Sequence, residues 1–375
     1  MSPEPVSGPI EHVYVHFPFC ARKCPYCDFN SHAGRDAETD VYIDAILAEA
    51  RTYAPHMHPR TIFVGGGTPT HCDAAQLERY LAGLLEIFGD DALGEFTVEA
   101  NPGSVDTAKV HALLRAGVNR VSLGAQSFDD RHLQTLGRIH AAEDTLRSAE
   151  ILRAAGMQRL SLDLILSVPK QTLDEQDRDL AQVIDIDPEH VSAYVLTYEP
   201  GTTFTRAMEA GRLPAPVDDR DLAHLHLACE RLQAAGFGRY EISNFARPGA
   251  ESRHNLAYWR NVAWLGLGAG AHSHVGGRRW KNVDDPAAYA RAASSSDESP
   301  VAWRESVPPD MGLLESLMMG LRLTAGVDLD ELTARHGVDL RRTHADVLTA
   351  HAAQGLLVLD GPRLSLTEHG LDVAN

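Results

Sequence analysis

Over the first two hundred residues, short apolar runs typical of buried strands alternate with segments whose apolar residues recur at helical spacing. Asp73 with Gln76, and Thr172 with Glu175, each match a capping box at the start of a helical pattern. Such βα units in series predict an α/β fold with a parallel sheet and right-handed crossovers, curled or closed into a partial (β/α)6 barrel. Its ligands should lie at the carboxyl ends of the strands. The strand-like runs cover 13–19, 61–65, 95–100, 120–125, 159–166 and 190–197, and the helical patterns cover about 40–53, 73–88, 104–116, 141–155 and 172–186.

The pattern changes after residue 200. A winged-helix-like arrangement is indicated at the end of the chain, where three helical patterns precede two short strands around the turn Asp360-Gly361-Pro362. We therefore expect a barrel core at 1–240, a barrel extension and linker at 241–305, and a winged-helix-like domain at 306–375. The segments behind this prediction are a helix at 218–235, a strand at 240–245, an irregular stretch at 252–282, a short helix and linker at 284–300, helices at 310–324, 328–336 and 340–353, and two strands within 356–370.

The composition is that of a folded, acidic protein. Of 375 residues 44% are hydrophobic and 23% charged, which excludes a largely disordered chain. The net charge is 34 − 52 = −18, so a basic footprint for nucleic acid is absent, and the arginines of the C-terminal segment are scattered among acids. No run approaches eighteen apolar residues, and the first residues lack the apolar core of a secretory signal. These features predict a protein with no integral membrane segment and no nucleic-acid partner.

Three of the five cysteines, Cys20, Cys24 and Cys27, lie within eight residues directly after the first strand. Three thiolates at this spacing can converge on one metal centre. They are one short of a four-cysteine iron–sulfur cluster or a closed tetrahedral zinc site, so a cluster held by them leaves one iron open. A structural zinc completed by His16 or His32 is the alternative that spacing alone leaves open.

The C-x3-C-x2-C pattern resembles the signature of radical S-adenosylmethionine (SAM) proteins. The resemblance implies that the cysteines hold a 4Fe-4S cluster, whose fourth iron is chelated by the amino and carboxylate groups of SAM. Tyr26 occupies the usual aromatic position before the last cysteine. Gly66, Gly67 and Thr68, in the run GGGTP after the second strand, support the same interpretation because glycines let a backbone approach a ligand. A plain tight turn would have the same sequence.

Within these proteins the chain resembles the oxygen-independent coproporphyrinogen III oxidase-like family over almost its whole length. The segments 14–20 and 27–32 are close to that family's opening motif. Two polar positions also have structural interpretations: Asp163 could cap a helix, and Gln126 could be a satisfied core amide. By resemblance, the SAM contacts would be Tyr14, Gly66, Glu99, Gln126, Arg138 and Asp163.

Two functions share this family's fold: a coproporphyrinogen III dehydrogenase and a haem chaperone. The dehydrogenase carries a fourth cysteine where this chain has Phe29, and it has a longer extension before the triad than the 19 residues here. The haem chaperones carry an HNxxYW motif, which matches residues 254–259. All three features favour the haem chaperone, a protein that binds haem and delivers it to acceptor haemoproteins. The resemblance implies residence in the cytoplasm and acceptors of the respiratory chain, and it leaves open a homodimer and a peripheral membrane contact through those acceptors.

The motif offers a candidate haem ligand. His254 could coordinate haem iron through a neutral imidazole, with Tyr258 and Trp259 packing against the porphyrin. In the alternative, the motif is a packed loop around the barrel opening, and His254 is hydrogen-bonded to backbone.

Overall fold

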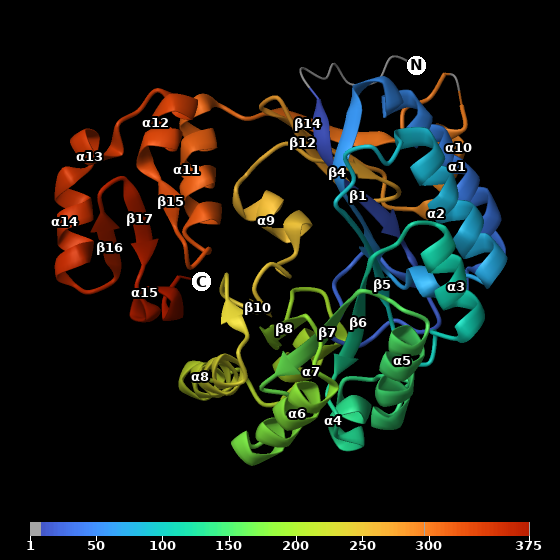
Figure 1. The fold of residues 1–375 in the computed structure, drawn as a ribbon, viewed down its shortest axis with the longest axis horizontal. Helices are drawn as coiled ribbons and strands as arrows, with labels where there is room; N and C mark the ends of the chain where they lie inside the picture. The colour runs from blue at the N-terminus through green and yellow to red at the C-terminus, as the bar shows by residue number, and fades with distance from the viewer. Residues whose placement is uncertain (1–8, 296, 375) are drawn as a thin grey trace.

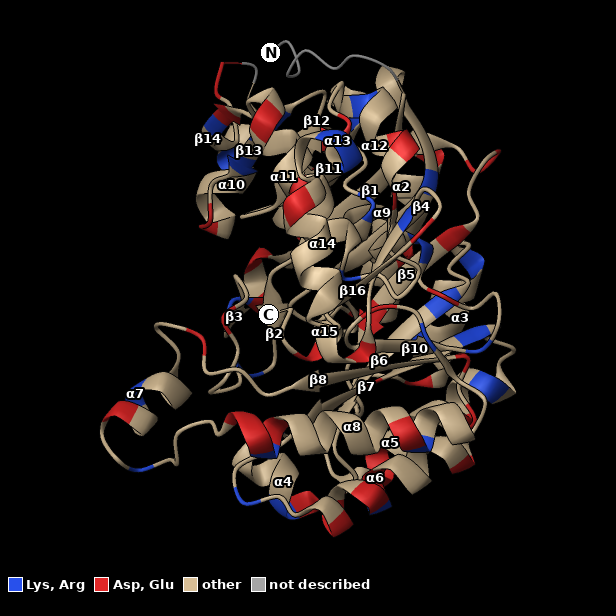
Figure 2. Ribbon diagram, turned by 90° about the vertical axis from the view of Figure 1, so that its left-hand side faces the viewer, with Lys and Arg blue, Asp and Glu red and all other residues tan. Residues whose placement is uncertain are grey.

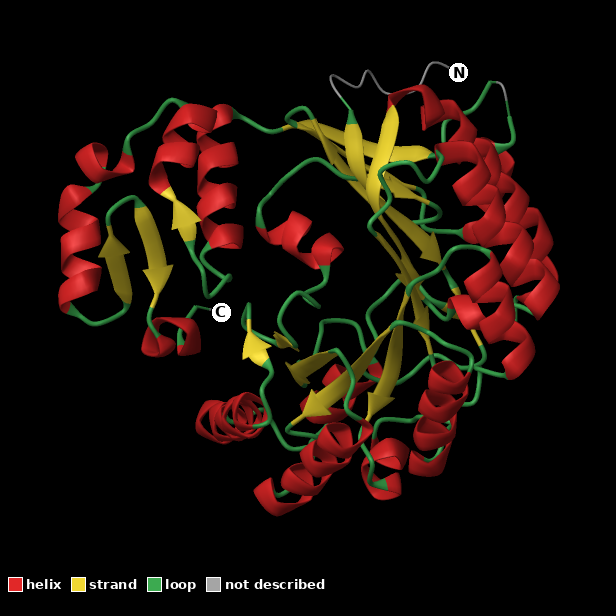
Figure 3. Cartoon of the chain, in the orientation of Figure 1, coloured by secondary structure: helices red, strands yellow, loops and turns green. Residues whose placement is uncertain are grey.

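The computed structural model describes residues 9–295 and 297–374, so residues 1–8 of the expected barrel core and Asn375 lie outside it. Its centre is a nine-stranded sheet in the order β11-β1-β4-β5-β6-β7-β8-β10-β9. The expected parallel strands form its middle, and helices cover its outer face (Figures 1 and 3). These strands are β1 (Ile10–Phe17), β4 (Met57–Gly66), β5 (Glu95–Ala100), β6 (Arg120–Gln126), β7 (Arg159–Leu166) and β8 (His190–Val195).

Most of the covering helices form where the pattern predicts them, whereas the short helices Asp130–Thr135 and Thr203–Glu209 were not predicted, and the partial barrel is confirmed. Both capping boxes are present: Asp73 accepts a hydrogen bond from the backbone of Gln76 at 2.8 Å, and Thr172 accepts one from Glu175 at 3.2 Å. Figure 2 shows acidic residues along several of these outer helices. The helices are α1 (Thr39–Tyr53), α2 (Ala74–Phe88), α3 (Thr107–Arg115), α4 (Asp130–Thr135), α5 (Ala142–Ala154), α6 (Leu173–Ile186), α7 (Thr203–Glu209) and α8 (Asp218–Ala234).

The segment predicted to be irregular, 252–282, is ordered and contains a helix and three strands. The helix α9 (Arg253–Trp259) follows its N-cap residue Ser252, whose hydroxyl accepts the backbone N–H of Asn255 at 3.3 Å. Glu95, at the start of β5, also accepts hydrogen bonds from the backbone N–H groups of Arg253 and His254, at 2.9 and 3.1 Å. Because Glu95 is more than 150 residues away, no local pattern could reveal this second contribution. The strands are β11 (Leu265–Leu267), β12 (His272–Val275) and β13 (Arg278–Asn282), and β13 also pairs with β14 (Val301–Ser306).

Other local predictions need correction. The strand expected at 240–245 is two short strands, β9 (Gly238–Arg239) and β10 (Asn244–Ala246). β10 pairs antiparallel with β8, and β9 pairs antiparallel with β10 at the edge of the sheet. Helix α4 was not predicted, and the helix expected at 340–353 is interrupted at His344, whose extended φ of −129° ends α13 (Leu340–Thr343) before α14 (Ala345–Ala353). The remaining short elements of the barrel are β2 (Phe19–Cys20), β3 (His32–Ala33), α10 (Pro286–Ala293) and the 3-10 turns Asp36–Glu38, Ala54–His56 and Pro69–His71.

The C-terminal part has a hydrophobic core of its own, which includes Leu313, Leu329 and Leu364. Its three-stranded sheet, in the order β15-β17-β16, packs with helices in the winged-helix-like arrangement that the sequence predicts. The barrel core includes residues as late as Tyr289, so the expected limits at 240 and 305 stay predictions. The elements are α11 (Pro309–Gly320), β15 (Val327–Asp328), α12 (Leu329–His336), α13, α14, β16 (Leu357–Asp360), β17 (Arg363–Leu366) and α15 (Glu368–Asp372).

Among the described residues, no helix combines the length and the apolar character that crossing a membrane requires.

Candidate cofactor site

One cavity of about 510 Å³ occupies the interior of the barrel and the carboxyl ends of its strands. Thr68 is the one predicted site residue that does not line it; its hydroxyl donates to Sγ of Cys20 at 3.4 Å and accepts from Asn101 at 2.7 Å. The structure thus collects residues from seven segments of the chain around a single space. The predicted residues on its wall are Tyr14, Cys20, Cys24, Tyr26, Cys27, Gly66, Gly67, Glu99, Gln126, Arg138, Asp163 and His254.

The cysteines lie on a loop between β1 and α1, and all three are partly exposed. The backbone N–H of Cys27 donates to the carbonyl of Cys24 at 3.1 Å, which turns the loop back on itself. Among the described residues, Cys20, Cys24 and Cys27 do not form a group whose ligand atoms all lie within 4.8 Å of one another. Around one tetrahedral zinc, thiolates with Zn–S bonds of about 2.3 Å lie about 3.8 Å apart. The three sulfur atoms are therefore not gathered as they would be around a single zinc.

Neither histidine proposed to complete a zinc site is oriented for that role. Both ring nitrogens of His16 are hydrogen-bonded, Nδ1 to the hydroxyl of Tyr14 at 2.9 Å and Nε2 to the carbonyl of Asn30 at 2.8 Å. Nε2 of His32 is bonded to the side chain of Asn30 at 3.0 Å. The two rings therefore brace the cysteine loop, and burial lowers the pKa of His16 to about 4.

The glycines after β4 are required by the packing around them. Gly66 has φ 104°, and a Cβ there would lie 2.3 Å from the ring of His16. At Gly67 a Cβ would lie 2.7 Å from the carbonyl oxygen of Phe17. Both residues also line the cavity, so their lack of side chains serves the strand contact and keeps the space open.

Arg138 brings a positive charge to the cysteine end of the cavity. Its Nη1 lies 3.7 Å from Sγ of Cys24, and its Nη2 donates to the carbonyl of Gly124 at 3.0 Å and to the side chain of Asn101. Tyr26 packs edge-on against Phe204 at 6.1 Å. The guanidinium is thus fixed beside a thiolate position.

The carboxylates expected to contact SAM lie deeper. Glu99 accepts a hydrogen bond from the backbone N–H of Gly66 at 2.9 Å, and burial raises its pKa to about 7. Asp163 accepts from the hydroxyl of Ser122 at 3.0 Å, and burial raises its pKa as well. Because its partner is this side chain on the neighbouring strand, the alternative of a helix-capping Asp163 is not supported. Gln126 has φ 66°, an uncommon conformation for a residue with a side chain, where the register of β6 shifts.

His254 is 1% exposed and projects from α9 to the inner wall of the cavity. Its Nδ1 is hydrogen-bonded to the hydroxyl of Thr61 at 2.8 Å, and that hydroxyl also meets Nδ1 of His12 at 2.9 Å. Nε2 is buried and has no hydrogen-bond partner among the described residues. The ring stacks on Phe63 at 5.4 Å, and burial lowers its pKa to about 3. His254 is therefore not bonded to backbone through its side chain, and one ring nitrogen is uncommitted.

The HNxxYW motif is a helix, so its aromatic residues do not share one face. Tyr258 follows His254 by one turn, packs edge-on against it at 4.8 Å and lines the cavity. Trp259 is not on the cavity wall; its ring faces the guanidinium of Arg322 at 4.7 Å. The expected shelf of two aromatic rings beside His254 is thus wrong, because five residues along a helix turn the side chain about 140° further around the axis.

Several cavity residues escaped the sequence analysis. Along β6 the wall is formed by alternate residues, Arg120, Ser122, Gly124 and Gln126. This period of two is the signal that could have found them, since successive strand residues point to opposite faces. The alternation is hard to recognise in the sequence because most strand residues on both faces are apolar. Others on the wall are Asn101, His190, Ser192, Tyr194, Tyr240 and Asn244.

The arrangement has the features of a known class. The family model for the radical SAM superfamily matches residues 14–182, and the model for the HemN C-terminal domain matches residues 307–373. The structure of coproporphyrinogen III oxidase HemN from Escherichia coli, described as a radical SAM enzyme, is similar with a TM-score of 0.84 and 23% identity, covering 98% of this chain and 88% of that one. The chain is therefore a radical SAM protein with a HemN-type C-terminal domain.

Curated relatives narrow the class further. The chain is 36% identical to the heme chaperone HemW of Bacillus subtilis over 98% of its own length and 97% of that protein. It is 38% identical to the heme chaperone HemW of Mycobacterium tuberculosis, over 98% of this chain and 93% of the relative. The chain belongs to the HemW family of haem chaperones.

Proposed function

We propose that this protein binds haem and delivers it to acceptor haemoproteins, with a 4Fe-4S cluster and SAM as its cofactors. The observation that carries the proposal is the convergence of three cysteines, two partly buried carboxylates and an uncommitted imidazole on one cavity. Delivery to respiratory-chain acceptors, residence in the cytoplasm and a homodimer rest on the family resemblance alone.

Cys20, Cys24 and Cys27 would hold the cluster through their thiolates. The occupied nitrogens of His16 support this role, because they leave that imidazole unable to complete a zinc site with the thiolates. When bound, such a cluster offers an open iron to the amino and carboxylate groups of SAM. Arg138, beside Cys24, is placed to bind a carboxylate at this end of the cavity.

Glu99 and Asp163 would orient SAM from the inner side. Both are carboxylates on the cavity wall, and each keeps acceptor capacity beyond the hydrogen bond that fixes it. Carboxylates so held can accept the hydroxyls of a ribose. Tyr14, Gly66, Gly67 and Gln126 would form the wall around the ligand, while Thr68 would support Cys20 from behind.

His254 is the proposed haem ligand, through Nε2. Burial keeps the imidazole neutral, as coordination requires, and its other nitrogen is already fixed by Thr61. The cavity volume of about 510 Å³ is within the range of a site for one drug-sized molecule. Haem bound by His254 and SAM bound beside the cysteines would therefore compete for the same space.

The test is a haem titration of anaerobically prepared, cluster-loaded protein, followed through the Soret band, with and without saturating SAM. We expect about one haem per chain, weaker haem binding when SAM is present, and a changed Soret band in His254→Ala. His272→Ala is the matched control, because that exposed histidine lies on β12 and not on the cavity wall. If SAM leaves haem binding unchanged and His254→Ala behaves as wild type, the haem ligand lies elsewhere; if wild type binds no haem, the chaperone proposal fails.

The dehydrogenase alternative has its own test. Phe29, 58% exposed, lines the cavity where that enzyme would carry a fourth cysteine. Supplied with coproporphyrinogen III, SAM and a reductant, the protein should form no protoporphyrinogen IX. Sustained decarboxylation over many turnovers would restore the dehydrogenase reading.

A further inference from the structure

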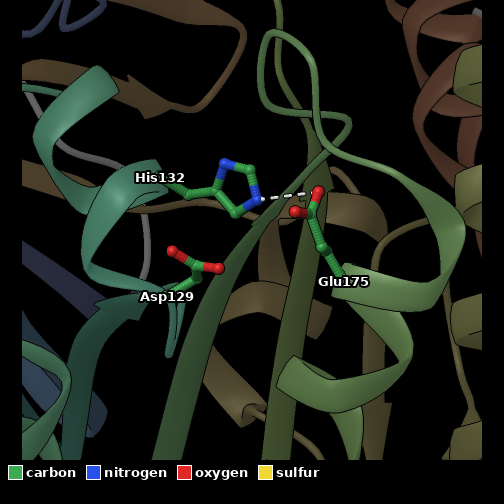
Figure 4. Close-up of side chains that lie close together, drawn as sticks. All are labelled: Asp129, His132 and Glu175. Atoms are coloured by element: carbon green, nitrogen blue, oxygen red, sulfur yellow. Dashed lines mark ion pairs between the residues drawn. The ribbon is translucent and has the colours of Figure 1, made fainter.

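Asp129, His132 and Glu175 bring three metal-type donor atoms together outside the cofactor cavity (Figure 4). Asp129 caps α4, His132 lies in the first half of that helix, and Glu175 lies in the first turn of α6. The fold thus joins two segments more than forty residues apart, and the donor atoms all lie within 4.8 Å of one another. One imidazole nitrogen with carboxylate oxygens is a donor set that divalent first-row transition metals accept.

His132 is the observation that separates this cluster from an ordinary group of surface acids. The residue is 5% exposed, and its Nε2 is buried without a hydrogen-bond partner among the described residues. Nε2 lies 3.3 Å from Oε2 of Glu175 and points toward it, but the contact does not have hydrogen-bond geometry (Figure 4). A buried polar nitrogen is costly when it lacks a partner. A cation between the three side chains would give it one.

The guanidinium of Arg131 supplies the positive charge that pairs with Asp129 and Glu175 in this structure. Its Nη2 lies 2.8 Å from Oε1 of Glu175, and the same guanidinium pairs with Asp129. Oε2 of Glu175 is used differently, because it accepts the backbone N–H of Thr172 in the capping box at 2.9 Å. The side chain of Arg131 is 69% exposed, and such exposed ion pairs are weak. Arg131 can therefore turn into solvent and leave Oε1 to a cation without breaking the cap of α6.

We propose that Asp129, His132 and Glu175 form a binding site for one divalent transition-metal cation of the zinc type, for which Arg131 is the built-in competitor. The site ties α4 to the start of α6. The segment between β6 and α4 is already hydrogen-bonded to α6: the hydroxyl of Ser127 and the backbone N–H of Phe128 donate to Asp179, both at 2.7 Å. Gln126 and Arg138, which line the cofactor cavity, flank this segment, so a bound cation would stiffen the support of that wall.

Zinc alone is the probe, added to cluster-loaded protein that has been freed of other metals. Zinc uptake is counted by elemental analysis, and affinity is measured by calorimetry. Any zinc taken by the cysteines is common to every variant, so the comparison isolates the new site whether or not the cluster forms. We expect wild type to bind one zinc more than His132→Ala, and we expect Glu175→Gln, which keeps the cap, to weaken binding about tenfold or more.

Two further variants make the proposal sharp. Arg131→Ala should bind zinc more tightly than wild type, because it removes the competing guanidinium. Asp130→Asn is the matched control: this neighbouring carboxylate accepts the backbone N–H of Ala142 at 2.9 Å and should leave zinc binding unchanged. At the same zinc concentration, zinc should also raise the melting temperature of wild type more than that of Glu175→Gln. Equal zinc content in wild type and His132→Ala, or no gain in affinity in Arg131→Ala, would reduce the cluster to an ion-pair network.

Discussion

The two ends of the cofactor cavity differ in the kind of backbone that carries their residues and in how the polar side chains are fixed. The cysteine end is a loop rather than a strand or helix. It is turned by the hydrogen bond from Cys27 to Cys24 and held by contacts with other segments, such as Tyr26 on Phe204. The inner end is made of strand and helix residues whose polar atoms bond one another. Examples are the hydrogen bonds Ser122–Asp163, Ser161–His190 and Thr61–His254, at 3.0, 2.8 and 2.8 Å.

Electrostatics follow the same division. Burial raises the pKa of the thiols of Cys20 and Cys27, so thiolates at this end require a positively charged partner. At the inner end burial raises the pKa of Glu99 to about 7 and lowers that of His254 to about 3, and both groups are anchored by hydrogen bonds. The comparison indicates that the inner end is preorganised by the protein, whereas the cysteine end is completed by what it binds. Variants at the two ends should therefore fail in different ways.

The largest effect is expected at the cysteine end. Cys24→Ala should lose most of the iron, because two thiolates cannot hold a 4Fe-4S cluster in the place of three. Elemental analysis and absorbance after anaerobic reconstitution measure this, with about four irons per chain expected in wild type. Cys72→Ala, a buried cysteine outside the cavity wall, is the control. Stoichiometric zinc without iron–sulfur absorption in wild type would contradict the cluster.

At the inner end the cluster should survive while ligand affinity falls. Glu99→Ala should retain its iron but bind SAM about tenfold or more weakly, since a hydrogen bond to a charged group contributes about 1.5–3 kcal/mol. Calorimetric titration with SAM measures the affinity. Unchanged affinity would remove Glu99 from the site, and loss of iron in this variant would show that the two ends are not independent.

A pH dependence should distinguish the ends without any ligand. The raised pKa of Glu99 means that the folded chain keeps a proton which the unfolded chain releases near pH 4.5. The contribution of protonated Glu99 to the free energy of unfolding is complete below pH 4.5 and is lost as the pH rises through about 7. The stability of wild type relative to Glu99→Gln, measured by urea unfolding of the cofactor-free protein, should fall from pH 5 to pH 8. Glu49, whose pKa burial also raises to about 7, is present in both and cancels. A pH-independent difference would be evidence against a protonated Glu99.

The smallest effect is expected from removing the hydroxyl of Thr61, which lies between His12 and His254. Thr61→Val removes the shared partner of His12 and His254 and leaves Nδ1 of His254 buried without a hydrogen bond, which costs about 1–3 kcal/mol. We expect a lower melting temperature and an altered haem spectrum, with normal iron content. Thr52→Val, at an exposed threonine near the end of α1, should do neither. If both variants melt alike, the hydroxyl has no role in holding His254.

The sequence was most informative where the chemistry is carried by neighbouring residues. Cys20, Cys24 and Cys27 follow one strand within eight residues, and the capping boxes at Asp73 and Thr172 need only four residues each. Strands and helices buried on a regular pattern were therefore found, with errors mostly of a few residues at their ends. The segment 252–282 was misjudged because its helix depends on Glu95, a partner supplied by another strand.

By itself, then, the sequence determined the class of fold, the succession of βα units and the identity of the cysteine donors, since these depend on local periodicity and spacing. Only the tertiary structure decided that the other site residues share one cavity, that Trp259 faces away from His254, and that Asp129, His132 and Glu175 meet. The physical reason is that closing a curved sheet sets the distances between residues far apart in the chain. The same closure buries Nε2 of His132 and of His254, and among the described residues neither nitrogen has a hydrogen-bond partner.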